Sequence, residues 1–213
     1  MDLFSRSLSD LLDTVGDLTD DDFARPSGCA DWLVRDLVCH FVIDAQDVLI
    51  TLVTPTADAV THDAVTYWKV SHTPSDDPLS ALTVRLAAAY GEPWMLRHHV
   101  QDVGRAAVRA AQIADPQLKV GTQDMVLAVA DYLGAYVWEW TLHHLDLVAH
   151  LPHARRPHAD ALARCREVLE RVGGAFPASW RDEDVLLVGT GRRAPTEAER
   201  AELGDLRIPF VLA

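Results

Sequence analysis

One fourteen-residue stretch in the second half of the chain concentrates side chains that could do chemistry. The segment VWEWTLHHLDLVAH, residues 137–150, carries a glutamate, three histidines and an aspartate among apolar residues. Because successive residues of an α-helix advance by about 100°, Glu139, His143, Asp146 and His150 would share one helix face. An unpaired carboxylate in a protein core is costly and favours a nearby cation or proton. The segment therefore predicts a polar stripe on an otherwise buried helix.

Glu139 and His143 have the i, i+4 spacing with which one helix supplies two metal ligands. A third ligand from a facing helix would complete a His-His-Glu set, a known composition for catalytic zinc with an open position for water. His40 is the best candidate because it lies on the side of its helix that turns toward the core. Asp44, one turn later, is the other option, and Asp36, one turn earlier, could accept the second imidazole N–H and fix the tautomer. A buried ion pair between glutamate and histidine, without a metal, is the alternative interpretation.

The other polar residues of this helix are assigned less direct roles. Asp146 and His150 continue the stripe, so we expect them to support the ligands or to line a pocket. Tyr136 lies on the same side of the helix, where its phenol could contact a substrate, although core packing is the favoured interpretation. His144 faces about 100° away from His143 and is interpreted as a residue of a helix interface.

Apolar periodicity predicts a mainly α-helical fold. The predicted helices cover residues 3–18, 30–53, 78–114, 122–151 and 158–175. Gly91 and Pro93 predict a kink or a break in the third of them, and Thr122 is the predicted N-cap of the fourth. Residues 55–77, rich in Pro, Thr, Asp and Ser, are predicted to form a long connection after the second helix. Four long helices with one long crossover are typical of a four-helix bundle.

The C-terminal part of the chain differs in pattern. The segment DVLLV, residues 184–188, predicts a strand, and IPFVL, residues 208–212, predicts a possible second strand. Between them TEAERAEL predicts a short helix with a capping box formed by Thr196 and Glu199. We therefore expect a metal-binding helical bundle over residues 1–155, followed by a C-terminal helix and a small α/β tail over residues 156–213.

Composition excludes several classes of function. The formal net charge of −13 disfavours a nucleic-acid partner, since the basic residues cluster only in short pairs such as 155–156 and 192–193. The three cysteines show no C-x-x-C spacing, so neither a disulfide framework nor a thiolate zinc site is indicated. The start of the chain lacks the features of a signal peptide, and no apolar run reaches about 18 residues. We expect a cytoplasmic monomer or homodimer without membrane contact.

The segment GTGRRA, residues 189–194, fits a loose dinucleotide-binding pattern. Pro195 follows at once, and only about twenty residues remain, too few to complete a βαβ unit. A tight turn that leads into the capped helix is the favoured interpretation of this segment.

Two segments resemble a known family. WLVRDLVCHFV, residues 32–42, resembles the W-x-V-x-D-L-x-x-H segment of the mycothiol-dependent maleylpyruvate isomerase-like proteins, a branch of the DinB-like metal-binding bundles. DYLGAYVWEWTLHHLDLVAHL, residues 131–151, is similar to the family's second segment, in which E-x-x-x-H precedes an aspartate-leucine pair. The resemblance places the family's metal ligands on His40, Glu139 and His143, and it implies a DinB-like four-helix bundle with a divalent metal, most simply zinc.

The same resemblance implies a co-substrate and a reaction class. Mycothiol, a small-molecule thiol, would be activated as a metal-bound thiolate and would attack a small electrophilic substrate, in an isomerase or an S-transferase. The tail is shorter than the C-terminal domain of the named isomerase, so maleylpyruvate itself is not implied as the substrate. Two other functions stay open: a non-catalytic metal-binding regulatory or binding module, and a metal-dependent hydrolase of the same fold.

Overall fold

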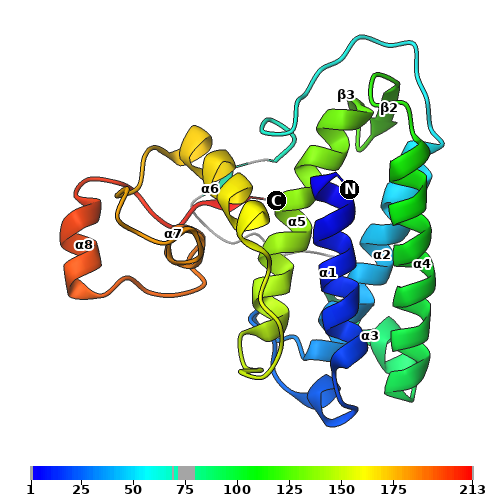
Figure 1. Cartoon of the computed structure of the whole chain (residues 1–213), viewed down its shortest axis with the longest axis horizontal. Coiled ribbons are helices and arrows are strands. Elements are labelled where there is room, and N and C mark those ends of the chain that lie inside the picture. Colours follow the sequence, from blue (N-terminus) through cyan, green and yellow to red (C-terminus); the bar gives the residue numbers. More distant parts are fainter. Residues whose placement is uncertain (1, 69, 72–79, 213) are drawn as a thin grey trace.

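Four helices of 15 to 21 residues run side by side and contain most of the buried core (Figure 1). The computed structural model describes residues 2–68, 70–71 and 80–212, and these residues form a mainly helical protein, as predicted. The helices are α1 (Leu3–Asp17), η1 (Asp21–Ala24), α2 (Val34–Leu52), α3 (Ser80–Ala89), α4 (Pro93–Ile113), α5 (Val129–Val148), α6 (Ala159–Gly173), α7 (Asp182–Gly189) and α8 (Glu197–Leu203). The strands are β1 (Val70–Ser71), β2 (Lys119–Thr122), β3 (Met125–Ala128) and β4 (Val211–Leu212).

The packing of these helices follows from their apolar faces. α4 lies against α1 and α2, α1 also contacts α5, and α3 covers part of α2. Asp2 is the N-cap of α1: its carboxylate accepts the backbone N–H of Ser5 at 2.9 Å and caps the first turn. α5 is buried on nearly every side, and side chains such as Trp140 and Leu147 are fully enclosed. Such a helix belongs at the centre of a fold.

The third predicted helix is divided into α3 and α4, which confirms the expected break. Gly91, between them, has a φ of +70°, a conformation that side chains with a Cβ rarely adopt. Pro93 occupies the first turn of α4, where its missing N–H has no helical partner to lose. The predicted start of the second helix was early, because α2 begins at Val34 after Asp31, which has a φ of +63°.

The predicted start of the fourth helix at Thr122 is wrong. Residues 119–128 form the antiparallel β2–β3 hairpin, and α5 begins only at Val129. Gln123 and Asp124, the two turn residues, have φ values of +46° and +63°, the left-handed conformation that a two-residue hairpin turn requires. The apolar run continues from the hairpin into α5 without a change of composition, so periodicity did not mark the boundary. Val120 is buried under the start of the crossover, where it forms a β-bridge with Pro55, and this burial stabilises the hairpin.

The predicted strand over residues 184–188 is also wrong, because these residues belong to helix α7. Three acidic residues, 182–184, occupy its first turn, where they interact favourably with the helix dipole. Its apolar residues pack on α6, which in turn lies beside α5. The close approach is visible at Gly189, where a Cβ atom would lie 2.6 Å from a methyl group of Leu169.

Two predictions about the tail are confirmed. α8 carries the expected capping box: Glu199 N–H donates to Thr196 Oγ1 at 3.3 Å, and Thr196 N–H donates to the Glu199 carboxylate at 2.7 Å. The last predicted strand contains β4, which pairs antiparallel with β1 of the crossover. The predicted boundary near residue 155 falls between α5 and α6, and the division into two domains stays a prediction.

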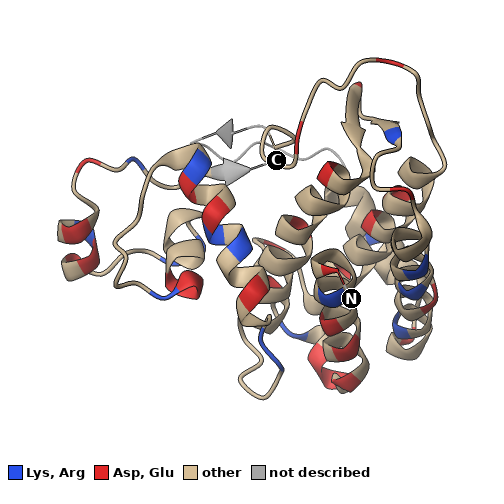
Figure 2. Ribbon diagram, turned by 45° about the horizontal axis from the view of Figure 1, so that its top comes forward, with Lys and Arg blue, Asp and Glu red and all other residues tan. Residues whose placement is uncertain are grey.

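The surface carries charges of both signs. Figure 2 shows aspartate and glutamate prominent on α1 and α8, and lysine and arginine scattered over several elements. Within the described residues no helix is long and apolar enough to cross a lipid bilayer.

Candidate metal centre

Helices α2 and α5 face each other with polar side chains at matching positions. Each helix presents three of them at i, i+4 and i+7, which places them on one face over two turns. They are His40, Asp44 and Asp47 on α2, and Glu139, His143 and Asp146 on α5. The centre of this arrangement lies where Glu139 and His143 of α5 meet His40 of α2.

The donor atoms of His40, Glu139 and His143 all lie within 4.8 Å of one another. Glu139 Oε1 is 2.9 Å from His143 Nε2 and 3.2 Å from His40 Nε2. The two imidazole rings are nearly perpendicular, at 86°, with centroids 4.9 Å apart. The three side chains are 17–22% exposed, so a small molecule in solvent can reach them. A single divalent cation needs nitrogen and oxygen donors at about 2.0–2.2 Å, and these three converge closely enough to supply them after small shifts.

The electrostatics of this cluster is dominated by opposite charges held out of water. Burial alone would lower the pKa of His143, but the charge of Glu139 raises it well above the ordinary value. For Glu139, burial would raise the pKa, yet His143 and His40 together hold it below its usual range. Burial would also lower the pKa of His40, but the carboxylates of Asp44 and Glu139 raise it above its ordinary value. The cluster thus stabilises positive charge at its centre, which a proton or a metal ion can supply.

Asp146 contacts the imidazole of His143 on the side opposite to Glu139. Its Oδ2 lies 3.0 Å from Nδ1 of His143, the ring nitrogen that faces away from Glu139. A hydrogen bond from Nδ1–H leaves Nε2 free to act as a donor to a metal. This position agrees with the supporting role expected for Asp146.

Arg192 holds Asp146 in place, although it comes from the turn after α7. Its guanidinium donates two hydrogen bonds, Nε to Oδ1 and Nη2 to Oδ2, both of 2.8 Å. Burial would raise the pKa of Asp146, but His143 and Arg192 hold it well below its usual range. The backbone also contributes, because Gly28 N–H donates to the Asp146 carbonyl at 2.7 Å. A Cβ on Gly28 would lie 2.8 Å from Asp146 Cα, so this approach requires glycine.

A protein-family model described as the mycothiol maleylpyruvate isomerase N-terminal domain matches residues 4–148. The chain belongs to this family. The matched residues include α1 to α5 and therefore all three donors of the cluster, whereas Arg192 lies outside the family domain. No curated protein and no solved structure matches the chain. Family membership confirms the resemblance that the two sequence segments indicated.

Asp36 does not support His40, contrary to the expectation from its spacing. Its Oδ2 accepts the backbone N–H of Leu33 at 2.8 Å and so caps the first turn of α2. The α2 carboxylate that does approach His40 is that of Asp44, whose Oδ2 lies 3.1 Å from Nε2. The start of α2 and the cluster therefore use two different aspartates.

His150 lies outside the metal-ligand cluster. α5 ends at Val148, and the side chain of His150 is exposed beyond the helix. Tyr136 is buried, and its hydroxyl donates to Asp47 Oδ2 at 2.6 Å, which agrees with core packing rather than with a free phenol. His144 is also buried, with Nε2 3.0 Å from both Thr14 Oγ1 and the Arg155 carbonyl oxygen, as expected for a helix interface.

Sequence analysis missed Cys29 and Arg192. Cys29 Sγ lies 3.6 Å from His143 Nδ1 and 3.4 Å from Asp146 Oδ2, so these three residues form a second group of possible ligands. Cys29 belongs to no spaced motif, and Arg192 lies in the GTGRRA segment, which was interpreted only as a tight turn. The other two cysteines are buried, and burial raises the pKa of Cys39 to about 11.

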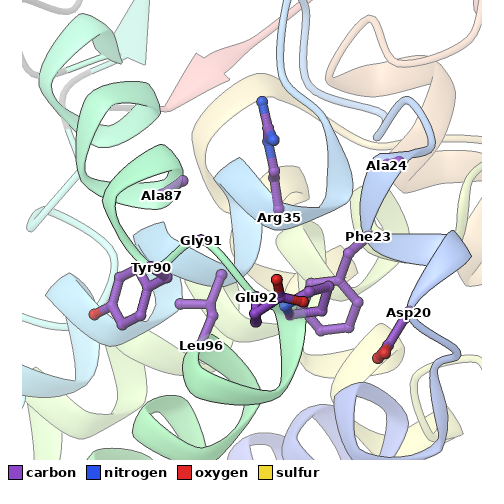
Figure 3. Close-up of a pocket in the computed structure, with 10 residues that line it drawn as sticks. Asp20, Phe23, Ala24, Arg35, Ala87, Tyr90, Gly91, Glu92 and Leu96 are labelled. Atoms are coloured by element: carbon purple, nitrogen blue, oxygen red, sulfur yellow. The ribbon is translucent and has the colours of Figure 1, made fainter.

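A separate cavity of about 80 Å³ lies between η1, α2 and the α3–α4 connection (Figure 3). Phe23, Arg35, Tyr90 and Leu96 are among the residues that line it. None of the donors of the metal-ligand cluster contributes to its walls. This cavity is therefore distinct from the candidate metal centre.

Proposed function

We propose that this protein is a metal-dependent, thiol-using transferase or isomerase whose divalent cation, most simply zinc, is held by His40, Glu139 and His143. The observation that carries the proposal is the convergence of these three donors from α2 and α5 within 4.8 Å. Membership of the mycothiol maleylpyruvate isomerase family supports mycothiol as the co-substrate. The proposal includes a DinB-like four-helix bundle, which is supported by the side-by-side packing of α1, α2, α4 and α5.

The residues around the cluster fit a divalent cation. Four carboxylates, at positions 44, 47, 139 and 146, lie on the facing sides of α2 and α5, and the neighbouring guanidinium is that of Arg192. Negative charges that are held partly out of water need a compensating cation. Two imidazoles and one carboxylate also match the donor types of catalytic zinc sites with an open position.

Each residue then has a defined task. A divalent cation at this position would supply Lewis acidity and make a coordinated thiol a nucleophile at neutral pH. Asp146 accepts the Nδ1–H of His143 and keeps Nε2 directed at Glu139, while Arg192 fixes the orientation of Asp146. The indole of Trp32 packs against the imidazole of His40, with ring centroids 5.3 Å apart, and limits its rotation. An electrophile that binds beside the cluster would receive the sulfur.

Metal content tests the site directly. Purified protein is expected to contain about one divalent metal ion per chain, as measured by elemental mass spectrometry, and His143→Ala should lose it. His150→Ala is the matched control, since this histidine lies on the same polypeptide stretch but outside the cluster and should leave metal content unchanged. Wild-type protein that folds fully without metal, and takes up none, would contradict the proposal.

Thiol use is tested separately on cobalt-substituted protein. Addition of a low-molecular-weight thiol is expected to produce a sulfur-to-cobalt charge-transfer band in the near ultraviolet. A spectrum that stays unchanged at saturating thiol would contradict thiol activation, and hydrolytic turnover without thiol would instead favour metal-assisted hydrolysis.

A further inference from the structure

A cavity of about 500 Å³ lies at the end of the bundle where α1 begins, α4 ends and α5 begins (Figure 1). A residue of α6 closes one side of it. Small-molecule sites in proteins have volumes of roughly 300–1,000 Å³ and mostly apolar walls. The walls of this cavity are of that kind, and they include Phe4, Ala111, Val129, Leu133, Gly134 and Val137. The cavity is therefore large enough to hold a small organic molecule.

The cavity and the metal-ligand cluster lie on opposite faces of α5. Residues 130, 133, 134 and 137 line the cavity, whereas Glu139 and His143 belong to the cluster. At about 100° per residue, the centres of the two sets are separated by about 150° around the helix axis. A ligand in the cavity would thus be separated from the proposed metal by α5, and its binding does not depend on the proposed function.

Small side chains keep this space open. Ala111 and Ala114 at the end of α4 face Ala130 and Gly134 of α5 across the cavity walls. A Cβ on Gly134 would lie 3.3 Å from Cβ of Ala64, so the crossover passes close over this part of α5. A large side chain at one of the alanine positions would fill the cavity.

Arg164 of α6 supplies a polar group at the cavity wall. Its side chain is only 30% exposed, yet its one hydrogen bond among the described residues runs from Nη1 to Glu167, which is 65% exposed, at 3.1 Å. By contrast Arg166, which is 15% exposed, donates four hydrogen bonds. A guanidinium has five N–H donors, so Arg164 retains donors for a further acceptor.

The carboxylate at the cavity wall is engaged elsewhere. Asp2 Oδ1 accepts the backbone N–H of Ser5 at 2.9 Å, and Oδ2 accepts the Ser5 hydroxyl at 2.8 Å. Among the described residues, the ion pair of Arg164 is with Glu167 and not with Asp2. The free donors of Arg164 are therefore available to an acceptor on a bound molecule.

We propose that this cavity binds an amphiphilic carboxylate, a small molecule with an apolar body and one carboxylate end. The apolar body is buried against α1, α4 and α5, which removes its surface and that of the cavity walls from water. The carboxylate accepts charge-assisted hydrogen bonds from Arg164. A neutral apolar molecule of the same size gains only the first of these two contributions.

The test measures the binding of octanoate and of 1-octanol to the purified protein by isothermal titration calorimetry. The two molecules have alkyl chains of the same length, and only octanoate carries a carboxylate. Octanoate should bind at one molecule per chain and at least about tenfold more tightly than octanol, because hydrogen bonds between charged groups contribute this much. Absence of octanoate binding at millimolar concentrations, or equal affinity for the two molecules, would overturn the proposal.

A pair of arginine variants tests the carboxylate contact. Arg164→Gln should weaken octanoate binding by at least about tenfold and change octanol binding by less than about threefold. Arg171→Gln is the matched control, since Arg171 is an exposed residue of the same helix outside the cavity wall. It removes the same charge and should change both affinities by less than about threefold. Equal weakening of octanoate binding by both substitutions would show a general effect of net charge and overturn the proposal.

Two further variants locate the bound molecule. Ala130→Phe should weaken the binding of both molecules by at least about tenfold, and unchanged octanoate binding in the folded variant would place the ligand elsewhere. Ala114→Phe replaces it if circular dichroism shows that the first variant does not fold. His143→Ala should leave octanoate binding unchanged, because His143 lies on the opposite face of α5. Loss of binding in this variant would place the carboxylate on the proposed metal and overturn the inference.

Discussion

The ion pair between Arg192 and Asp146 ties the C-terminal part of the chain to α5, and its removal should be measurable as lost stability. Both hydrogen bonds are 2.8 Å long, and the side chains of the arginine and the aspartate are 24% and 3% exposed. Arg192→Met keeps much of the apolar length of the side chain but leaves the Asp146 carboxylate buried without its cation.

The expected cost follows from the burial of the pair. Breaking a buried ion pair by removal of one partner costs about 3–5 kcal/mol. Asp146 keeps its contact with His143 Nδ1, so we expect the lower end, about 3 kcal/mol. For a chain of this size each kcal/mol shifts Tm by about 2–4 °C, which gives a decrease of about 6–12 °C.

Arg193→Met is the matched control for this prediction. Arg193 is the next residue in the chain, is 33% exposed, and pairs with Asp184 and Glu199 within the tail. Its partners are 26% and 20% exposed, against 3% for Asp146, so its loss should cost less, about 1 kcal/mol. Thermal and urea unfolding at pH 7 would measure both variants. Equal destabilisation by the two substitutions, or a loss below about 1 kcal/mol in Arg192→Met, would refute the reasoning.

The pH dependence provides a second check on the same pair. His143 and Arg192 depress the pKa of Asp146 in the folded protein, so the stabilisation is present above the unfolded-state value near 4 and is lost as the pH falls through the folded-state value. The difference in stability between wild type and Arg192→Met should therefore shrink in strongly acidic solution. A difference that grows as the pH falls below about 4 would show that the pair is not its source.

Three further predictions follow from individual contacts. Burial lowers the pKa of His144 to about 4, below the unfolded value of about 6.5, so stability should fall by up to about 3 kcal/mol between pH 6.5 and 4. Urea unfolding across this pH range should show that His144→Gln loses less stability than the wild type, whereas the exposed control His150→Gln loses as much as the wild type. Superimposable pH profiles of wild type and His144→Gln would contradict this prediction. Gly28→Ala should cost about 1–3 kcal/mol in urea unfolding, because its Cβ would meet the Asp146 backbone at 2.8 Å, whereas Gly121→Ala, with its nearest contact at 4.0 Å, should stay within about 0.5 kcal/mol. A loss of similar size in both glycine variants would argue against this clash. When the free metal concentration is about a thousandfold above Kd, metal binding should stabilise the folded protein by about 4 kcal/mol. Removal of the metal by a chelator should therefore lower the Tm. An unchanged Tm would argue against a metal bound to the folded state.

Local periodicity was enough to predict several parts of this protein. The spacing of Glu139 and His143 places both on one helix face wherever that helix lies, and the apolar pattern of the second helix turns His40 toward the core. The break between α3 and α4 and the capping box of α8 were also predictable, because Gly, Pro, Thr and Glu act on the backbone next to them. In each case the controlling interaction spans only a few residues.

Features that depend on a distant partner could be identified only in the folded chain. Short apolar segments such as 125–128 and 184–188 have no conformation of their own, and the neighbours that bury them selected a strand for the first and a helix for the second. The same applies to the aspartates of α2, since one caps the helix and another approaches His40 although both lie one turn from it. Arg192 reaches Asp146 across 46 positions through an irregular turn, and no periodic pattern encodes such a contact. The candidate ligands could therefore be predicted from the sequence, whereas the residues that hold them in place could be identified only from the folded structure.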